Sequence, residues 1–216
     1  GCINQIIEEL AKYTLPSQIL SDVGSVKNIF SKNILKLCDR NFLLVPGHPI
    51  AGTEHSGAAN AMVDLFKKKW CILTPINNQK KSTKLIADLW RRIGMKVSFM
   101  TMKEHDKIMS ITWLLPHLIA FSIVGTAFNL DIKNKKKLIN FAAGGFKDFT
   151  RIGSSDPRMW TDIFIKNKKQ ISETLDIFLN DISKLNILIK ENKTDDIFAL
   201  LKRTKLIRKS ILKKEI

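Results

Sequence analysis

The pattern of hydrophobic and polar positions divides the chain into two parts. Up to residue 101, short apolar runs alternate with longer segments whose apolar residues recur every three or four positions. Short runs bounded by turn residues predict strands, and the longer spacing predicts amphipathic helices. The predicted strands are residues 18–21, 42–45, 70–74 and 96–100. The predicted helices are residues 2–13, 26–37, 58–68 and 82–93, the last ended by Gly94.

No strand pattern returns after this point. The remaining segments all have helical spacing: residues 102–130, 133–143, 157–168, 171–191 and 195–214. Alternating strands and helices predict parallel strands with crossover helices. The first predicted element is a helix, and the sequence contains no G-x-G-x-x-G turn. The predicted fold class is therefore α/β then all-α, with the C-terminal half of a Rossmann-type parallel sheet at residues 1–101 and a helical domain at 102–216.

Residues 45–57 follow neither pattern. They contain three glycines, two prolines and two histidines, and they follow the predicted strand at 42–45. This composition predicts an irregular loop rather than a strand or a helix. Loops at the ends of buried strands are where α/β folds place their chemistry. His48 is therefore a candidate catalytic residue, and the alternative is a structural or merely exposed histidine.

Ser25 and Arg151 are two further candidates. Ser25 follows the first predicted strand, in a turn that begins at Asp22. Either residue could instead be a simple helix cap. Arg151 is one of few arginines in a lysine-rich chain, and its guanidinium fork suits a carboxylate ligand. The alternative is a structural ion pair with Glu54 or Asp148.

The long helix predicted at 102–130 carries a third candidate. Asp106 and His117 are eleven positions apart, which places them on one face of a regular helix. A histidine in so apolar a run needs a partner or a role. A core histidine with a satisfied hydrogen bond is the alternative reading.

Composition constrains the partners. The net charge is +16, and lysine supplies most of the positive charge. A basic surface attracts phosphate, so nucleic acid is one candidate partner. Scarce arginine and the lack of a nucleic-acid motif favour the other reading, lysines that decorate solvent-facing surfaces. We therefore expect no nucleic-acid partner.

Residues 108–130 carry no charge and are long enough to cross a membrane. Pro116 and His117 at their centre, with scattered serines and threonines, favour a helix buried in a core or a dimer interface. The three cysteines form no C-x-x-C pair or metal-binding cluster, and no signal peptide is visible. Sparse cysteines predict reduced thiols and a cytoplasmic location. We expect no membrane partner and no metal site.

Five sequence blocks together resemble the prephenate/arogenate (cyclohexadienyl) dehydrogenases of tyrosine biosynthesis. They occur in the family's order and span nearly the whole chain. The blocks are D-V-G-S-V-K at 22–27, H-P-I-A-G-T-E at 48–54 with S-G at 56–57, L-P-H at 115–117, G-F-K-D-F-T-R-I at 145–152, and S-D-P at 155–157 with M-W at 159–160.

The resemblance implies oxidative decarboxylation of prephenate or arogenate with NAD or NADP, by a homodimer. It implies that His48 bonds the ring hydroxyl of the substrate and that Ser25 orients His48 beside the nicotinamide. It also implies that Arg151 binds a substrate carboxylate. The other implied pocket positions are Thr53, Glu54, His117 and Asp148 for substrate, with Thr53 also near the cofactor.

The sequence departs from the family pattern at one place inside a block. Trp113 and Leu114 stand where the family pattern reads Ser-His. If these positions line the cavity, Trp113 narrows it and alters substrate choice, inhibition or activity. Together with the missing glycine-rich turn, this departure leaves a second function open, a non-catalytic protein of the same fold that dimerises or senses a ligand.

Overall fold

The structure is a computed structural model that describes residues 2–38, 40–52, 57–76, 79–130 and 142–212. The chain divides into two compact units, Gly1–Ile171 and Ser172–Ile216. The first unit contains the strands and the helices that follow them. The second is helical. The α/β-then-helical order predicted from the sequence is confirmed. The domain boundary predicted at residue 101 stays a prediction.

The described residues contain five strands in two small sheets. β1 (Ile19–Leu20) pairs in parallel with β2 (Leu43–Leu44). β3 (Gly47–Ile50), β4 (Trp70–Leu73) and β5 (Lys96–Phe99) form a sheet in that order. β4 and β5 are parallel, whereas β3 runs antiparallel to β4. The four predicted strands are present, and each of them pairs with a parallel neighbour.

The prediction that residues 45–57 contain no strand is wrong, because residues 47–50 form β3. Pro49 has no backbone N–H, and β3 can hold it because β3 is an edge strand of its sheet. Gly47 is needed for close packing. A Cβ atom there would lie 3.1 Å from Leu73 Cδ2 and 3.2 Å from the Asp22 carbonyl oxygen. Gly47 and Pro49, which suggested a loop, are therefore explained by close packing and by the edge position of β3.

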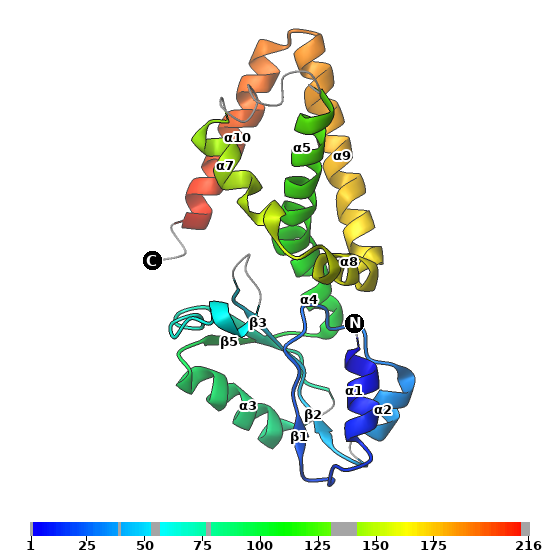
Figure 1. Cartoon of the computed structure of the whole chain (residues 1–216). Coiled ribbons are helices and arrows are strands. Elements are labelled where there is room, and N and C mark those ends of the chain that lie inside the picture. The colour runs from blue at the N-terminus through cyan, green and yellow to red at the C-terminus, as the bar shows by residue number, and fades with distance from the viewer. Residues whose placement is uncertain (1, 39, 53–56, 77–78, 131–141, 213–216) are drawn as a thin grey trace. The chain divides into compact units, whose positions relative to one another are not determined.

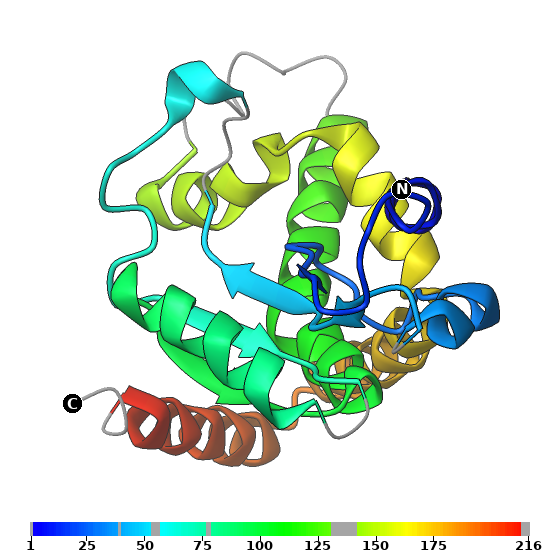
Figure 2. The ribbon, with the colours of Figure 1, turned by 90° about the horizontal axis from the view of Figure 1, so that it is seen from below.

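Helices flank the strands on both sides. α1 (Ile3–Leu10) and α2 (Lys32–Leu37) lie together on one side of β1 and β2, and α3 (Lys80–Arg92) lies on the other (Figure 1). Figure 2 shows the same strands from below, between α3 and the segment that leads into α8 (Pro157–Lys166).

Alternate strand residues fill separate apolar clusters, as expected for strands covered on both faces. Leu20 and Leu44 pack in the cluster beneath α1 and α2. Their neighbours Ile19 and Val45 pack in the cluster beneath α3. Ile72 belongs to a third cluster, formed with residues of the helical region. The strands therefore form the centre of the first unit, and the third cluster joins them to the helices that follow.

Two predicted helices are largely absent. In the segment 26–37, only α2 is helical, because the N–H groups of Lys27 and Asn28 donate to the Asp106 carboxylate instead. The helix begins after Ser31, whose hydroxyl accepts the N–H of Ile34 at 3.2 Å. In the segment 58–68, a single 3-10 turn at Ala58–Asn60 precedes irregular turns.

The failure at 58–68 has a packing reason. Val63 is fully exposed and Met62 is more than half exposed. Short helices are stable mainly through burial of an apolar face, and this segment buries little of its own.

One long helical run follows the strands. It consists of α4 (Met102–Met109), a π-helical turn (Ser110–Leu114) and α5 (Leu115–Leu130). The π turn ends two residues before Pro116, which lacks an N–H and cannot continue regular helical bonding to the turn before it. The helix predicted at 133–143 lies almost entirely outside the described residues.

A short connected segment returns the chain along α5. α7 (Gly144–Thr150), which the sequence pattern did not predict, leads into a 3-10 turn (Arg151–Ser154) and then α8. A Cβ atom at Gly153 would lie 3.3 Å from the backbone of Ala120 in α5. The missing side chain therefore lets the 3-10 turn approach α5 closely.

The second unit is a helical hairpin. It contains α9 (Lys168–Lys190) from Ser172 onward and α10 (Thr194–Leu212), and Asn192 turns the chain between them with φ +54°. Apolar side chains are exposed on both helices: Ile177, Leu179, Ile182, Ile187, Ile189, Phe198, Leu200, Leu201, Leu206, Ile207 and Ile211.

The observed start of α2 gives a stability prediction. Ser31→Ala removes the N-cap acceptor and should lower the free energy of unfolding by about 1 kcal/mol. Ser25→Ala is the matched control, because Ser25 lies in a turn and caps no helix. Urea titration followed by circular dichroism measures both. Destabilisation by the control alone would contradict the observed helix start.

Candidate active site

A cleft of about 530 Å³ opens in the first unit where the strands meet the helices. The turn after β1, strand β3, the π turn with α5, and the segment from Arg151 into α8 all contribute to its walls. Its lining residues are Val23, Ser25, His48, Pro49, Ile50, Ala51, Gly52, Leu65, Phe66, Lys69, Trp90, Trp113, His117, Arg151, Ile152, Ser155, Met159 and Trp160.

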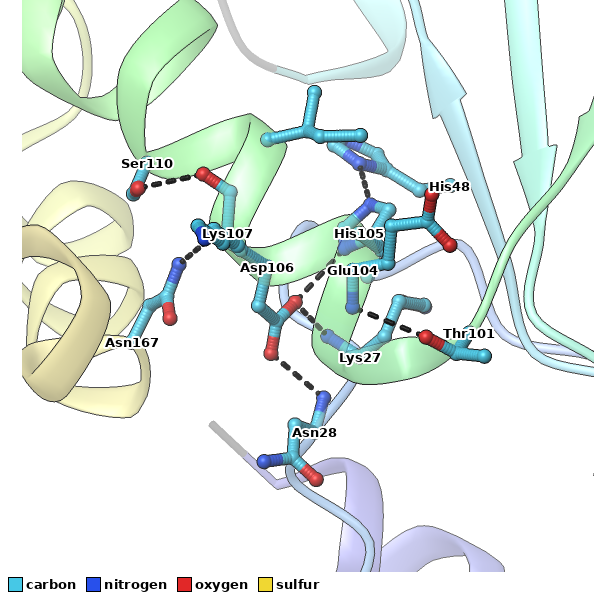
Figure 3. Close-up of polar contacts among 12 residues, drawn as sticks. Lys27, Asn28, His48, Thr101, Glu104, His105, Asp106, Lys107, Ser110 and Asn167 are labelled. Atoms are coloured by element: carbon cyan, nitrogen blue, oxygen red, sulfur yellow. Dashed lines mark hydrogen bonds and ion pairs between the residues drawn. The ribbon is translucent and has the colours of Figure 1, made fainter.

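A chain of hydrogen bonds leads from this cleft to a buried carboxylate (Figure 3). His48 Nδ1 lies 2.8 Å from His105 Nε2, and His105 Nδ1 lies 2.8 Å from Asp106 Oδ1. The same Asp106 oxygen accepts the N–H of Lys27 at 2.8 Å, and Oδ2 accepts the N–H of Asn28 at 2.8 Å. The side chains of His48, His105 and Asp106, which together form the His48 relay, are almost completely buried.

This series of hydrogen bonds determines the tautomer of His48. An ionised carboxylate only accepts hydrogen bonds, so His105 Nδ1 must donate to Asp106. When His105 is neutral, its Nε2 carries a lone pair and accepts the Nδ1–H of His48. His48 is then left with a lone pair on Nε2. The imidazole at the cleft can therefore accept a proton or a hydrogen bond from a ligand.

Burial keeps His48 neutral. Loss of solvent lowers the pKa of His48 from 6.5 to about 3, and the nearby His105 and Lys27 contribute to the same shift. The unfolded chain takes up a proton here below about pH 6.5, whereas the folded chain does so only near pH 3. The contribution of His48 to stability is therefore lost as the pH falls through this window.

A buried lysine fixes the turn after β1 against β3. Lys27 Nζ pairs with the Asp22 carboxylate and donates to the Gly47 carbonyl oxygen at 2.6 Å. Asp22 also accepts the N–H of Gly24 at 2.8 Å. Burial lowers the pKa of Lys27, although Asp22 opposes this shift. Ser25 lies within this fixed turn, half-buried at the edge of the cleft.

His117 and Arg151 lie on the helical side of the cleft. His117 Nδ1 donates to the Trp113 carbonyl oxygen at 2.8 Å, which leaves Nε2 as an acceptor in the neutral ring. Burial lowers the pKa of His117, and the positive charge of Arg151 lowers it further. The close approach of Gly153 to α5 places Arg151 on this side. This part of the cleft therefore combines a cationic fork with a neutral acceptor.

The aromatic rings of Trp113, His117 and Trp160 form a continuous wall next to His48. His117 stacks on Trp160 with ring centroids 3.9 Å apart. Trp113 lies 4.9 Å from Trp160, 5.7 Å from His117 and 5.2 Å from His48. The Trp160 indole N–H is buried and has no acceptor among the described residues. The wall is suited to a ring-shaped ligand.

The structure brings four of the predicted site residues to one cleft: Ser25, His48, His117 and Arg151. Asp148 is on α7, is exposed and does not line the cleft. Thr53 and Glu54 lie outside the described residues, and so does His55. Sequence reasoning missed His105 as the partner of His48. The available signal was the adjacent His105-Asp106 pair at the start of a long helix.

The prediction that Asp106 and His117 share a helix face is wrong. The π turn between them counts as one extra residue, which rotates the following helix by about 100°. His105 and His117 are twelve positions apart, so the π turn brings them to within about 20° of each other around the axis. It is therefore His105, and not Asp106, that faces the same side as His117.

Comparison with known proteins identifies the family. The family model described as the prephenate dehydrogenase nucleotide-binding domain matches residues 2–99, and the model for the prephenate dehydrogenase dimerization domain matches 101–203. The crystal structure of prephenate dehydrogenase from Aquifex aeolicus, in complex with hydroxyphenyl propionate and NAD+, has a TM-score of 0.86. It is 33% identical, over 97% of this chain and 73% of that one. The chain belongs to the prephenate dehydrogenase family.

Curated members of the prephenate dehydrogenase family are longer than this chain. Cyclohexadienyl dehydrogenase of Zymomonas mobilis is 33% identical, over 88% of this chain and 65% of the relative. Prephenate dehydrogenase of Bacillus subtilis is 32% identical, over 93% of this chain and 54% of the relative. The chain thus spans between half and two thirds of their length. Membership of the family confirms the Rossmann-like sheet and the helical domain after it.

The tautomer assigned to His48 in this member of the prephenate dehydrogenase family gives a prediction for NMR spectroscopy. Long-range proton–nitrogen NMR should show a bare Nε2 and a protonated Nδ1, and its Cε1 proton should not titrate above about pH 4. The chain has four histidines, so single histidine-to-asparagine variants assign the signals. A His48 signal that titrates near pH 6.5, or that carries its proton on Nε2, would contradict the relay.

Proposed function

We propose that this chain provides the catalytic site of a dehydrogenase that uses NAD or NADP to decarboxylate prephenate or arogenate oxidatively. The product would be 4-hydroxyphenylpyruvate from prephenate or tyrosine from arogenate. One observation supports the proposal above all. The His48 relay leaves a proton-accepting Nε2 in the same cleft as the Arg151 fork, so one molecule can present a hydroxyl to one and a carboxylate to the other.

His48 accepts the proton of the ring hydroxyl as the hydride leaves the same carbon. His105, which is oriented by the Asp106 carboxylate, accepts the Nδ1–H of His48 and so keeps Nε2 free to take the proton. In the free cleft, a pKa of about 3 makes His48 a weak base. A substrate with two carboxylates adds negative charge nearby and favours the protonated ring. Binding of the correct anion therefore raises the basicity that the reaction needs.

Arg151 holds the side-chain carboxylate of the substrate through paired hydrogen bonds. Neutral His117 beside it accepts a hydrogen bond without adding a second positive charge. The ring carboxylate leaves as carbon dioxide, and its electrons complete an aromatic ring. Fixed contacts at both ends of the substrate hold the ring in place while these bonds change.

The cofactor would meet this chain at the turn after β1. Ligands of parallel sheets bind at the carboxyl ends of the strands, and Val23 and Ser25 occupy that position and line the cleft. The G-x-G-x-x-G turn that holds a pyrophosphate is not in this sequence. We therefore assign Ser25, together with Thr53 from the sequence resemblance, to the nicotinamide end. The bound nicotinamide supplies the hydride acceptor.

We also propose a cytoplasmic homodimer, with no nucleic-acid or membrane partner. One described helix, Met102–Asn129, is long and apolar enough to cross a membrane. The dimerization-domain model covers this helix, and Ile123, Val124 and Phe128 expose apolar surface along it. A second copy of the chain is therefore the favoured partner for that surface. Glu54 and Asp148 remain proposed substrate-site residues on the sequence resemblance alone.

The activity test is production of NADH or NADPH from prephenate and from arogenate. His48→Asn should lower kcat by about 10²- to 10⁴-fold because the proton acceptor is lost. Arg151→Ala should mainly raise KM because its contact with the carboxylate is made before the reaction begins. An unchanged rate in His48→Asn would overturn the catalytic assignment.

The same assay separates an enzyme from a ligand-sensing protein of this fold. Calorimetric titration with NAD+ and with each substrate is performed on the chain and on any longer form that contains it. Binding together with turnover supports the dehydrogenase. Binding of substrate by folded protein without turnover under any of these conditions would support the sensing function instead.

A further inference from the structure

We propose that Trp113 is a positioning residue that closes the cleft over His48 and holds the six-membered ring of the ligand flat against its indole. The contact with the ligand ring rests on the function proposed above. The covering of His48 by Trp113 does not. Three observations carry the inference: where the π turn places Trp113, which rings it touches, and what keeps His48 out of water.

The π turn selects Trp113 for the cleft. Trp113 lines the cleft and is partly buried, whereas its neighbour Leu114 is completely buried in the apolar cluster beside it. The Trp113 carbonyl oxygen also accepts the His117 Nδ1 hydrogen bond. The His117 side chain, one turn further along the helix, therefore holds the backbone of Trp113 in place. The indole itself packs on Trp160, with ring centroids 4.9 Å apart.

The Trp113 indole lies next to His48 and also next to His117, which is close enough to Arg151 for that positive charge to lower the His117 pKa. Its ring centre is 5.2 Å from that of His48, with an angle of 58° between the planes. It also contacts Trp160 and His117, which stack on each other. A ligand whose ring hydroxyl reaches His48 Nε2 and whose carboxylate reaches Arg151 must therefore lay its ring along this wall.

A flat aromatic wall binds the ring of the product differently from the ring of the substrate. The ring of the substrate has two tetrahedral carbons, which keep it from lying flush on an indole. As the hydride and carbon dioxide leave, the ring becomes planar and aromatic. Stacked aromatic pairs gain about 0.5–1.5 kcal/mol beyond their buried area. Trp113 would therefore bind the ring more strongly as it approaches the product, which accelerates the reaction.

None of the charged and titratable groups around His48 is supplied by the Trp113 side chain. His105 and Asp106 come from α4, Lys27 comes from the turn after β1, and the Cys71 sulfur accepts a hydrogen bond from the His48 backbone. Across the cleft lie His117 and Arg151. Burial raises the pKa of Cys71 to about 12, so that thiol stays neutral. A Trp113 variant leaves all these groups in place and changes mainly the access of water.

The first test needs neither substrate nor cofactor. In Trp113→Leu, water reaches His48, and NMR titration should show its pKa rising by about one unit or more because burial is the main cause of its depression. Trp113→Phe should restore most of the wild-type value. Trp70→Leu, an exposed tryptophan on β4 outside the cleft, is the control and should leave His48 unchanged. An unchanged His48 pKa in folded Trp113→Leu would overturn the closure.

The second test uses a pair of probes, 3-(4-hydroxyphenyl)propionate and its saturated cyclohexyl counterpart, with NAD+ present. Wild-type protein should prefer the aromatic probe, and Trp113→Leu should reduce that preference about two- to tenfold. Trp113→Phe should retain it. An unchanged preference in Trp113→Leu would overturn the stacking role. If wild-type protein bound neither probe, the proposed function would fail, and the histidine titration would still decide the closure.

Discussion

The Asp106 carboxylate is the interaction on which the rest of the site depends. It accepts two backbone N–H groups from the turn after β1 and the Nδ1–H of His105. Its own backbone carbonyl accepts a hydrogen bond from Asn167 at 3.0 Å. Asp106 therefore joins the strand region, α4 and the end of α8, and the charge of its carboxylate sets the direction of every hydrogen bond as far as His48. Removing it would leave several buried donors without partners, which is costly.

Lys27 ties the turn after β1 to two other elements at once. It donates its backbone N–H to Asp106, while its side chain reaches Asp22 and the Gly47 carbonyl oxygen in β3. Because both groups belong to a single residue, the turn that carries Ser25 and the strand that carries His48 are held relative to α4. The buried lysine in the D-V-G-S-V-K block thus has a structural reason, even though it does not itself line the cleft.

Much of the architecture could be predicted from periodicity, because long amphipathic segments such as α3 and short apolar runs such as β4 have distinct spacings. Predictions failed where tertiary contacts override local preference. β3 was mistaken for a loop because an edge position tolerates Pro49. Ser25, His48, His117 and Arg151 were candidates from their residue types and positions, but only the sequence resemblance joined them into one pocket, because it carries spatial information that spacing lacks. His105 was missed because its partner, His48, is fifty-seven positions away in the sequence.

The π turn at Ser110–Leu114 has a consequence for how this chain can vary in length. It works as a one-residue insertion in the long helix, and it alone brings His105 and His117 to the same side. Substitutions in the turn alter single side chains, but deletion of one residue would remove the extra residue and turn α5 by about 100° relative to α4. His117 would then leave the cleft. In this stretch, homologous chains should therefore be far more constrained in residue number than in residue identity.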